Sequence, residues 1–316
     1  MQKLLISKRL PDSVLAEARE RYDVTLRETE ASMSASEVSD ALGTYDAILP
    51  TLGDDVSQAA INGCADVRCQ ILANFGVGFN HINVTAAKAR GLVVTNTPGA
   101  VTDATADIAI TLMLMTARRA GEGERLVRSG AWSGWQPTQM LGMHVSGKTV
   151  GIIGMGRIGQ AIAQRCHGGF GCKIVFANRS EKAVPNAMQL GSMAEVAQAA
   201  DIVFVATPGG PETRHLIDAD VLGAMQPHAI LVNISRGDVV DETALIAALN
   251  AGQLAGAGLD VYEHEPVVPE ALRAMENVTL LPHLGTNALE VREDMGRMAL
   301  ANLRAFFAGQ KVPNPV

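Results

Sequence analysis

The chain has 316 residues, of which 47% are hydrophobic and 19% are charged, and its formal net charge is −7. This length suits two domains better than one, and the composition excludes a disordered chain. An acidic chain without a run of basic residues is unsuited to nucleic acid, so we expect no nucleic-acid partner.

The sequence shows no sign of secretion or membrane insertion. The apolar run near Leu4 is too short for a signal peptide, and the longest apolar stretch, 108–117, is about half the length that crosses a bilayer. The four cysteines form no CxxC pair, and no histidine lies at zinc-finger spacing from them. We therefore expect free thiols, no metal site, no membrane partner and a cytoplasmic location.

The first hundred residues alternate short apolar runs with helical patterns. We expect strands at 3–7, 23–26, 47–49, 70–73 and 93–95, and helices at 12–22, 35–42, 56–63 and 84–90. Alternation at this spacing predicts a parallel sheet with helices on both faces.

A second series begins near residue 101. Thr102, Asp103 and Thr105 can cap a helix that continues through 108–119, and an irregular segment at 130–142 holds both tryptophans. Further strands are expected at 149–153, 173–177, 202–206, 230–234, 256–261 and 278–281. About six strands make up a full dinucleotide-binding sheet.

The last predicted helix, 290–307, has no partner in the second series and is expected to return to the first domain. We therefore predict a discontinuous, flavodoxin-like substrate-binding domain of residues 1–98 and 286–316. Residues 99–285 would form a dinucleotide-binding Rossmann domain.

A glycine-rich turn follows the first strand of the second series. Its sequence is Gly154-Met155-Gly156-Arg157-Ile158-Gly159, a GxGxxG between a predicted strand and a predicted helix. Here Gly154 permits the tight turn, Gly156 lets the backbone approach a pyrophosphate, and Gly159 lets helix and strand pack closely. Since the unpaired N–H groups of the helix face such phosphates, we assign these six residues to a dinucleotide site.

The residues after the next strand bear on the choice of dinucleotide. An NAD site usually carries Asp or Glu there to hold the ribose 2′-hydroxyl, whereas this chain has Asn178-Arg179-Ser180. Arg179 can pair with a 2′-phosphate, and Asn178 and Ser180 can donate hydrogen bonds to it. We therefore predict that NADP(H) is preferred. If Arg179 is only a solvated loop residue, NAD(H) is accepted as well.

Three chemically able side chains follow later strands of this series. Arg236, Glu265 and His283 come after the fourth, fifth and sixth strands, at the edge where open α/β sheets bind ligands. Arg236 can bind a carboxylate in bidentate fashion and polarise the neighbouring carbonyl. When hydride passes from a nicotinamide to C2 of a keto acid, His283 can protonate the oxygen. Glu265 can fix the tautomer of the imidazole and keep it charged near neutral pH.

Each of the three also has a structural interpretation. Arg236 could form a salt bridge with Asp238 or Asp260, Glu265 could begin a helix, and His283 could be a capped loop residue. Their shared position behind a cofactor loop favours catalytic roles for all three.

Together these motifs resemble the D-isomer-specific 2-hydroxyacid dehydrogenases, and within them the glyoxylate/hydroxypyruvate reductases. The resemblance covers about 73–307, and the residues before it match only in pattern. The segments that carry it are Asn74-Phe75-Gly76-Val77-Gly78, Thr95-Asn96-Thr97-Pro98-Gly99, Thr102-Asp103-Ala104-Thr105-Ala106-Asp107, the glycine-rich turn, Asn233-Ile234-Ser235-Arg236-Gly237, Ala257-Gly258-Leu259-Asp260-Val261 and Pro282-His283. They are highly specific for the family and less specific for the substrate.

The resemblance implies two Rossmann-like, doubly wound parallel-sheet domains with the active site in the cleft between them. It implies that the backbone N–H groups of Val77 and Gly78 bind the substrate carboxylate, with Arg236 and His283 as further substrate contacts. The further cofactor contacts that it implies are Thr105 near the nicotinamide, Thr207 and Pro208 beside the adenosine, Asp260 near the carboxamide, and Ile234, Ser235 and Gly285.

The resemblance also implies a homodimer. The segment with Trp132 and Trp135 looks like the dimer contact that in this branch reaches toward the partner's active site, although ordinary interface packing explains it equally well. The chain has Asn80, Asn83 and Asn178 where many relatives have an acidic residue. The first two departures bear on substrate preference, and the third drives the NADP(H) prediction.

The sequence therefore predicts an NADPH-preferring reductase of a small 2-keto acid, of the glyoxylate/hydroxypyruvate reductase type, that yields the D-2-hydroxy acid. A family member for 2-ketogluconate, hydroxyphenylpyruvate, D-lactate or 3-phosphoglycerate is the nearest alternative. Formate dehydrogenases of this fold pair their histidine with Gln, so Glu265 argues against one. A dinucleotide-sensing binding protein without physiological turnover is a more distant alternative, because no basic face or docking segment is evident.

Overall fold

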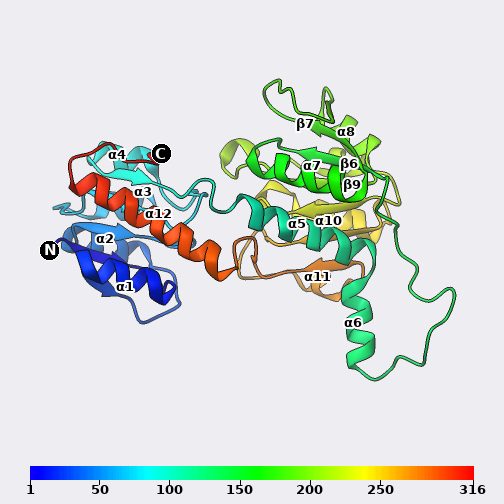
Figure 1. Ribbon diagram of the computed structural model, residues 1–316, viewed down its shortest axis with the longest axis horizontal. Helices are drawn as coiled ribbons and strands as arrows, with labels where there is room; N and C mark the ends of the chain where they lie inside the picture. The colour runs from blue at the N-terminus through cyan, green and yellow to red at the C-terminus, as the bar shows by residue number, and fades with distance from the viewer. The chain divides into compact units, whose positions relative to one another are not determined.

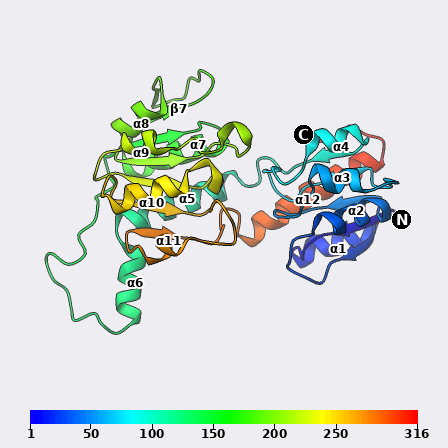
Figure 2. The same cartoon turned by 180° about the vertical axis from the view of Figure 1, so that it is seen from behind.

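The computed structural model describes residues 1–316 and divides into two compact units. Unit 1 comprises Met1–Val101 and Thr286–Val316, and unit 2 comprises Thr102–Gly285. Figures 1 and 2 show the chain from opposite sides, and in each unit helices cover both faces of a parallel sheet. The prediction of two parallel-sheet α/β domains is thus confirmed.

The sheet of unit 1 has five parallel strands in the order β2-β1-β3-β4-β5, which is the flavodoxin-like order of a doubly wound sheet. The strands are β1 (Lys3–Ile6), β2 (Asp23–Leu26), β3 (Ala47–Leu49), β4 (Ile71–Ala73) and β5 (Val93–Thr95). The helices are α1 (Asp12–Arg21), α2 (Ala35–Thr44), α3 (Gln58–Gly63), α4 (Val84–Ala89) and α12 (Leu289–Phe307).

Strand β1 shows how a short apolar run creates both layers of unit 1. Successive side chains of a strand point to opposite faces, so Leu4 and Ile6 face α1 and α12, whereas Leu5 faces α2, α3 and α4. All three side chains are buried. A strand that is covered on both faces therefore has a continuously apolar sequence.

The sheet of unit 2 has seven parallel strands in the order β12-β11-β10-β9-β6-β7-β8. The strands are β6 (Thr149–Ile153), β7 (Lys173–Ala177), β8 (Ala187–Gln189), β9 (Ile202–Val205), β10 (Ile230–Asn233), β11 (Gly256–Leu259) and β12 (Val278–Leu280). The prediction of about six strands was wrong by one, since β8 is short and carries no apolar run. The chain reverses direction across the sheet between β6 and β9, which is the switch point where this topology binds ligands.

The helices of unit 2 are α5 (Thr102–Ala117), α6 (Ala120–Arg128), α7 (Arg157–Phe170), α8 (Met193–Ala199), α9 (Ala219–Gly223), α10 (Glu242–Asn250) and α11 (Glu270–Ala274). Two short 3₁₀ turns, η1 (Pro211–Thr213) and η2 (Gly237–Val239), complete the unit. None of the helices in the chain is both long enough and apolar enough to cross a membrane.

The boundary between α5 and α6 differs from the prediction. The helix expected at 108–119 already begins at Thr102, so Thr102, Asp103 and Thr105 lie in its first turn rather than before it. Arg119 then takes a left-handed φ of 53°, which ends the helical run, and α6 starts anew. The sequence does not predict helix α6, because the helix buries none of its side chains and so no run of buried apolar residues marks it.

Candidate active site

The three predicted catalytic side chains lie at one edge of the sheet of unit 2. Arg236 follows β10, Glu265 follows β11 and His283 follows β12, and these three strands are neighbours. Because the strands are parallel, their carboxyl ends meet at the same edge. The glycine-rich turn after β6 lies at this edge too, on the far side of β9.

His283 and Glu265 are joined directly. Nδ1 of His283 is 2.9 Å from Oε2 of Glu265, while Oε1 of the same carboxylate accepts a hydrogen bond from the Tyr262 N–H at 3.1 Å. Burial raises the pKa of Glu265. The hydrogen bond from His283, the charges of His283 and Arg236, and the Tyr262 N–H lower the pKa by more than burial raises it, so it lies below its ordinary value. Glu265 is therefore a charged carboxylate that fixes the Nδ1–H tautomer of the imidazole.

The backbone of His283 is held in an uncommon conformation. Its φ is +54°, in the left-handed region, and its N–H donates to the Asp260 carbonyl at 2.9 Å. The buried Asp260 carboxylate accepts from the N–H groups of Leu284 at 2.6 Å and Gly285 at 2.9 Å. Each oxygen keeps a second lone pair, so a carboxamide N–H can still be accepted. Asp260 thus fixes the loop that carries His283.

Arg236 has no carboxylate partner. Its half-buried guanidinium donates to the Ser235 carbonyl at 2.7 Å. It forms no ion pair, neither with Asp238 nor with Asp260. Burial lowers the pKa of Arg236 from its usual value, and the nearby charges of Glu265 and Asp238 oppose this shift. The structural interpretation of Arg236 as a salt-bridge residue is therefore wrong, and most of its five N–H groups are available to an anion.

The loops that carry Arg236 and Glu265 are in van der Waals contact through a glycine. A Cβ on Gly237 would lie 1.8 Å from the carbonyl carbon of Tyr262, so no side chain fits there. The Tyr262 hydroxyl in turn donates to the Leu281 carbonyl at 2.9 Å, on the chain leading to His283. Neither contact was predicted, because both join backbone segments that are far apart in sequence.

The glycine-rich turn has the geometry that its motif requires. Gly154 has a φ of +98°, and a Cβ there would lie 2.8 Å from the Ala206 carbonyl, while a Cβ on Gly159 would lie 2.3 Å from the Gly154 oxygen. A Cβ on Gly156 would meet nothing within 4 Å. Gly154 and Gly159 thus serve the packing, whereas Gly156 leaves open space at the start of α7. No side chain caps that helix, so the N–H groups of its first turn are available to phosphate.

The loop after β7 is ordered by its own side chains. Asn178 accepts from the Met155 N–H at 3.2 Å and donates to the Ser180 carbonyl at 2.9 Å. Arg179 forms an ion pair with Glu212 at 3.1 Å, and the two side chains are 91% and 83% exposed. Arg179 is thus solvated, with a carboxylate beside it that competes with any phosphate.

Two residues of this loop region were not predicted. Lys182 donates from Nζ to the Met155 carbonyl of the glycine-rich turn at 2.9 Å. Gln189, on β8, donates to the carbonyls of Asn178 and Ser180, both at 3.3 Å. Lys182 places a second cation beside the turn, and the only sequence signal for it was its position four residues after Asn178.

Among the remaining cofactor candidates, the structure joins two pairs. The buried Thr105 donates to the Gly285 carbonyl at 3.1 Å, and Ser235 donates to the Thr207 carbonyl at 2.5 Å. Ile234 is buried and donates its N–H to the Val205 carbonyl at 3.4 Å, and Pro208 follows Thr207 on the same loop.

In unit 1, all three carbonyls of the Gly76–Gly78 loop (residues Gly76, Val77 and Gly78) accept hydrogen bonds from asparagine side chains. Asn74 donates to the carbonyls of Gly76 at 3.0 Å and Gly78 at 2.9 Å, and Asn96 donates to that of Val77 at 2.8 Å. The N–H groups of Val77 and Gly78 form no hydrogen bond within the protein. Adjacent free N–H groups of this kind suit a carboxylate.

Comparison with known proteins now identifies the chain. The model of the D-isomer specific 2-hydroxyacid dehydrogenase NAD-binding domain matches residues 110–285. The chain belongs to the D-isomer-specific 2-hydroxyacid dehydrogenases. It is therefore an NAD(P)-dependent oxidoreductase, and the recognition of this family from its motifs is confirmed.

Several dehydrogenases are similar over nearly their whole length. A glyoxylate reductase from Pyrococcus furiosus is 40% identical over 99% of this chain and 95% of its own. A glycerate dehydrogenase from Hyphomicrobium methylovorum is 37% identical over 98% of this chain and 97% of its own. The crystal structure of an NADPH-dependent glyoxylate/hydroxypyruvate reductase from Sinorhizobium meliloti, in complex with NADP and malonate, has a TM-score of 0.90 at 35% identity and covers 100% of this chain and 96% of that chain.

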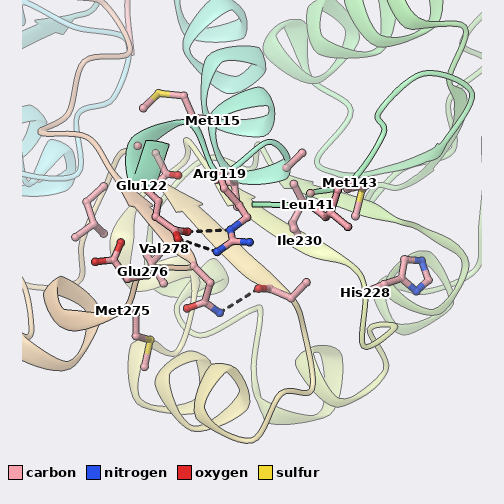
Figure 3. Close-up of a pocket in the computed structure, with 18 of the residues that line it drawn as sticks. Met115, Arg119, Glu122, Leu141, Met143, His228, Ile230, Met275, Glu276 and Val278 are labelled. Carbon is pink, nitrogen blue, oxygen red and sulfur yellow. Dashed lines mark hydrogen bonds and ion pairs between the residues drawn. The ribbon is translucent and has the colours of Figure 1, made fainter. Parts of the chain in front are cut away.

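This dehydrogenase also has a cavity of about 1010 Å³ at the opposite edge of the unit 2 sheet (Figure 3). It is lined by Met115 on α5, Arg119 and Glu122 at the start of α6, and Ile230 and Val278 at the starts of β10 and β12. Since these residues lie at the amino ends of the strands, the cavity is separate from the candidate active site.

Proposed function

We propose that this dehydrogenase is an NADPH-preferring reductase of small 2-keto acids, glyoxylate and hydroxypyruvate foremost, that forms the D-2-hydroxy acid. The observation that carries the proposal is the hydrogen-bonded Glu265–His283 pair beside an Arg236 that has no carboxylate partner. Relatives named glyoxylate reductase and glycerate dehydrogenase, similar over nearly the whole chain, support this substrate class.

The residues present fit a nicotinamide dinucleotide. The open space at Gly156 and the uncapped start of α7 suit a pyrophosphate, and we assign Thr105, Thr207, Ser235 and the residues named with them to the rest of the cofactor. A bound nicotinamide supplies the hydride. We assign cofactor binding to residues 99–285 and the substrate-binding domain to residues 1–98 and 286–316.

Groups of the protein bind the carboxylate of the reacting acid and supply the proton that its carbonyl oxygen gains. Arg236 binds the carboxylate and polarises the carbonyl oxygen, and the free N–H groups of Val77 and Gly78 bind the carboxylate as well. His283 gives the proton on Nε2 to the oxygen that becomes the hydroxyl. Glu265 holds Nδ1, so that only Nε2 is available for this transfer.

The cofactor preference rests on charge at the loop after β7. No carboxylate follows β7 directly, and Arg179 and Lys182 supply positive charge near the glycine-rich turn. Glu212 opposes them through its ion pair with Arg179. Glu181 is a second carboxylate in this loop, so the preference depends on the placement of the Arg179 and Lys182 donors, which can bond a 2′-phosphate. The S. meliloti reductase, described as NADPH-dependent, agrees with this preference.

We also propose a homodimer. In Figures 1 and 2, α6 and the segment after it project from the sheet of their own unit. That segment exposes Trp132 by 51%, Trp135 by 80% and Leu141 by 68%, which is costly for a free surface. The cavity beside α6 is a concave surface for a second copy. Light scattering of the wild-type chain and a Trp135→Ser variant tests this, and a wild-type monomer would exclude it.

Steady-state oxidation of NADPH and NADH, with glyoxylate, hydroxypyruvate, phenylpyruvate and 2-ketogluconate in parallel, tests the function. We expect the highest kcat/KM with NADPH and the two small acids, and a loss of at least about 100-fold in Arg236→Ala. Turnover only with a bulky acid, or only with NADH, would overturn the substrate or cofactor proposal. No turnover with any of the acids would overturn both.

A further inference from the structure

The carbonyls of the Gly76–Gly78 loop are anchored from outside the loop. The Thr97 N–H donates to the Gly76 carbonyl at 3.1 Å, and the Asn96 side chain donates to the Val77 carbonyl at 2.8 Å. Fixing the carbonyls of a peptide plane also fixes the direction of the N–H groups opposite them. The segment 96–97 therefore sets the orientation of the free N–H groups.

That segment is held in turn by one side chain of the last helix. Asn302, on α12, is 0% exposed, and its neighbours on the helix, Leu300 and Leu303, belong to the apolar core. Its Nδ2 donates to the Asn96 carbonyl at 3.2 Å. Its Oδ1 accepts from the Asn314 N–H at 3.0 Å.

The last residues of the chain lie along the same segment. The Asn96 N–H donates to the Asn314 carbonyl at 3.2 Å, and the Val316 N–H donates to the Val94 carbonyl at 3.0 Å. Thr95 and Pro315 form an antiparallel bridge. The tail thus extends the sheet beside β5, and the amide of Asn302 joins the tail to Asn96.

A buried amide in an apolar helix face needs an explanation. Burying a polar group costs free energy unless it forms hydrogen bonds, and an apolar residue would fill the same space at lower cost. Asn302 satisfies both ends of its amide on backbone groups that are far apart in sequence, Asn96 and Asn314. Its contribution is therefore the joining of these two segments.

We propose that Asn302 and the tail residues 314–316 are positioning elements for substrate: they clamp Asn96 and thereby hold the Gly76–Gly78 loop in its anion-binding conformation. The proposal rests on the proposed role of the Val77 and Gly78 N–H groups. It assigns a function in substrate binding to a helix residue and a chain end that do not themselves touch substrate.

The kinetic test compares Asn302→Ala with Leu303→Ala. Both remove a buried side chain from adjacent positions of α12, so both should lower Tm. Only Asn302→Ala should raise the KM for glyoxylate, by about tenfold, with the KM for NADPH unchanged and kcat within about twofold. Deletion of residues 314–316 should reproduce the rise in KM, and it supplies the test if Asn302→Ala does not fold.

A second readout does not depend on activity. Hydrogen exchange of a peptide spanning 94–98, which contains the bonded N–H groups of Asn96 and Thr97, should be at least about tenfold faster in Asn302→Ala and in the deletion than in Leu303→Ala. An unchanged KM with unchanged exchange, or an equal rise in KM in Leu303→Ala, would overturn the clamp. If the wild-type protein reduces no 2-keto acid, the proposed function fails, and the exchange measurement still decides whether the clamp exists.

Discussion

Nδ1 of His283 lies 2.9 Å from Oε2 of Glu265, and Nε2 of the same ring forms no hydrogen bond or ion pair within the protein. One nitrogen is therefore committed to the carboxylate, and the other is available to a substrate. An imidazole held in this way can exchange a proton with a substrate only through Nε2. This asymmetry is the basis of the first two predictions.

The first prediction concerns His283→Ala. Removing the proton donor should lower kcat for glyoxylate reduction by about 10²- to 10⁴-fold, while the KM for NADPH stays close to that of the wild type. His167→Ala is a matched control, because His167 lies near the C-terminal end of α7, bonds only the Cys172 carbonyl and lies outside the site. Steady-state kinetics of both variants decides the role, and full turnover in His283→Ala would remove it.

The second prediction concerns Glu265→Gln and the pH dependence of activity. The amide keeps the shape of the carboxylate but loses the charge that favours the protonated imidazole. Reduction requires that proton, so kcat/KM should begin to fall at a lower pH in the variant than in the wild type. Superimposable pH profiles would show that Glu265 only orients the ring.

The third prediction concerns stability. Folding lowers the pKa of Glu265 because the His283 hydrogen bond and the neighbouring charges outweigh its burial. A carboxyl group of this kind stabilises the folded state above its unfolded pKa of about 4.3, and the stabilisation is lost as the pH falls through the folded pKa. The loss of unfolding free energy in Glu265→Gln should thus be larger at pH 7 than at pH 4. Urea denaturation at the two pH values measures it, and equal losses would contradict the linkage.

The parts of the fold that sequence predicts well are those with a local cause. The apolar run of β6 followed by Gly154, Gly156 and Gly159 specifies a strand, a tight turn and a helix within a few residues. Strand β8 and helix α6 could not be predicted in this way, because neither has a buried side chain. Their conformation depends on contacts with segments far away in sequence.

The same distinction applies to the candidate site. The order of strands was enough to expect Arg236, Glu265 and His283 near one sheet edge, and the structure places them there. The contact of Gly237 with Tyr262 leaves no mark in either segment read alone. The contact becomes apparent only in the structure, because it joins the loops that follow two neighbouring strands, β10 and β11.

The fourth prediction concerns cofactor choice. Glu212 neutralises Arg179 through an exposed ion pair, so Glu212→Gln should free the guanidinium and lower the KM for NADPH by about threefold at low salt. Arg179→Ala and Lys182→Ala should each raise the KM for NADPH by about tenfold and leave that for NADH nearly unchanged. Glu20→Gln, an exposed position on α1 of unit 1, serves as a control for a general change in surface charge. Equal effects on the two cofactors would exclude a 2′-phosphate contact.

The fifth prediction compares alanine substitutions at two glycines, Gly237 and Gly168. A Cβ on Gly237 would lie 1.8 Å from the Tyr262 carbonyl carbon, whereas a Cβ on Gly168, inside α7, would meet nothing within 4 Å. Gly168→Ala should raise the unfolding free energy by about 0.5–1 kcal/mol, because alanine loses less backbone entropy in a helix. Gly237→Ala should lower it by about 3 kcal/mol or more, since backbone must move, and should lower kcat/KM because that movement separates Arg236 from the Glu265 loop. Urea denaturation and steady-state kinetics test both, and a Gly237→Ala variant with wild-type stability would show that the two loops are not in contact.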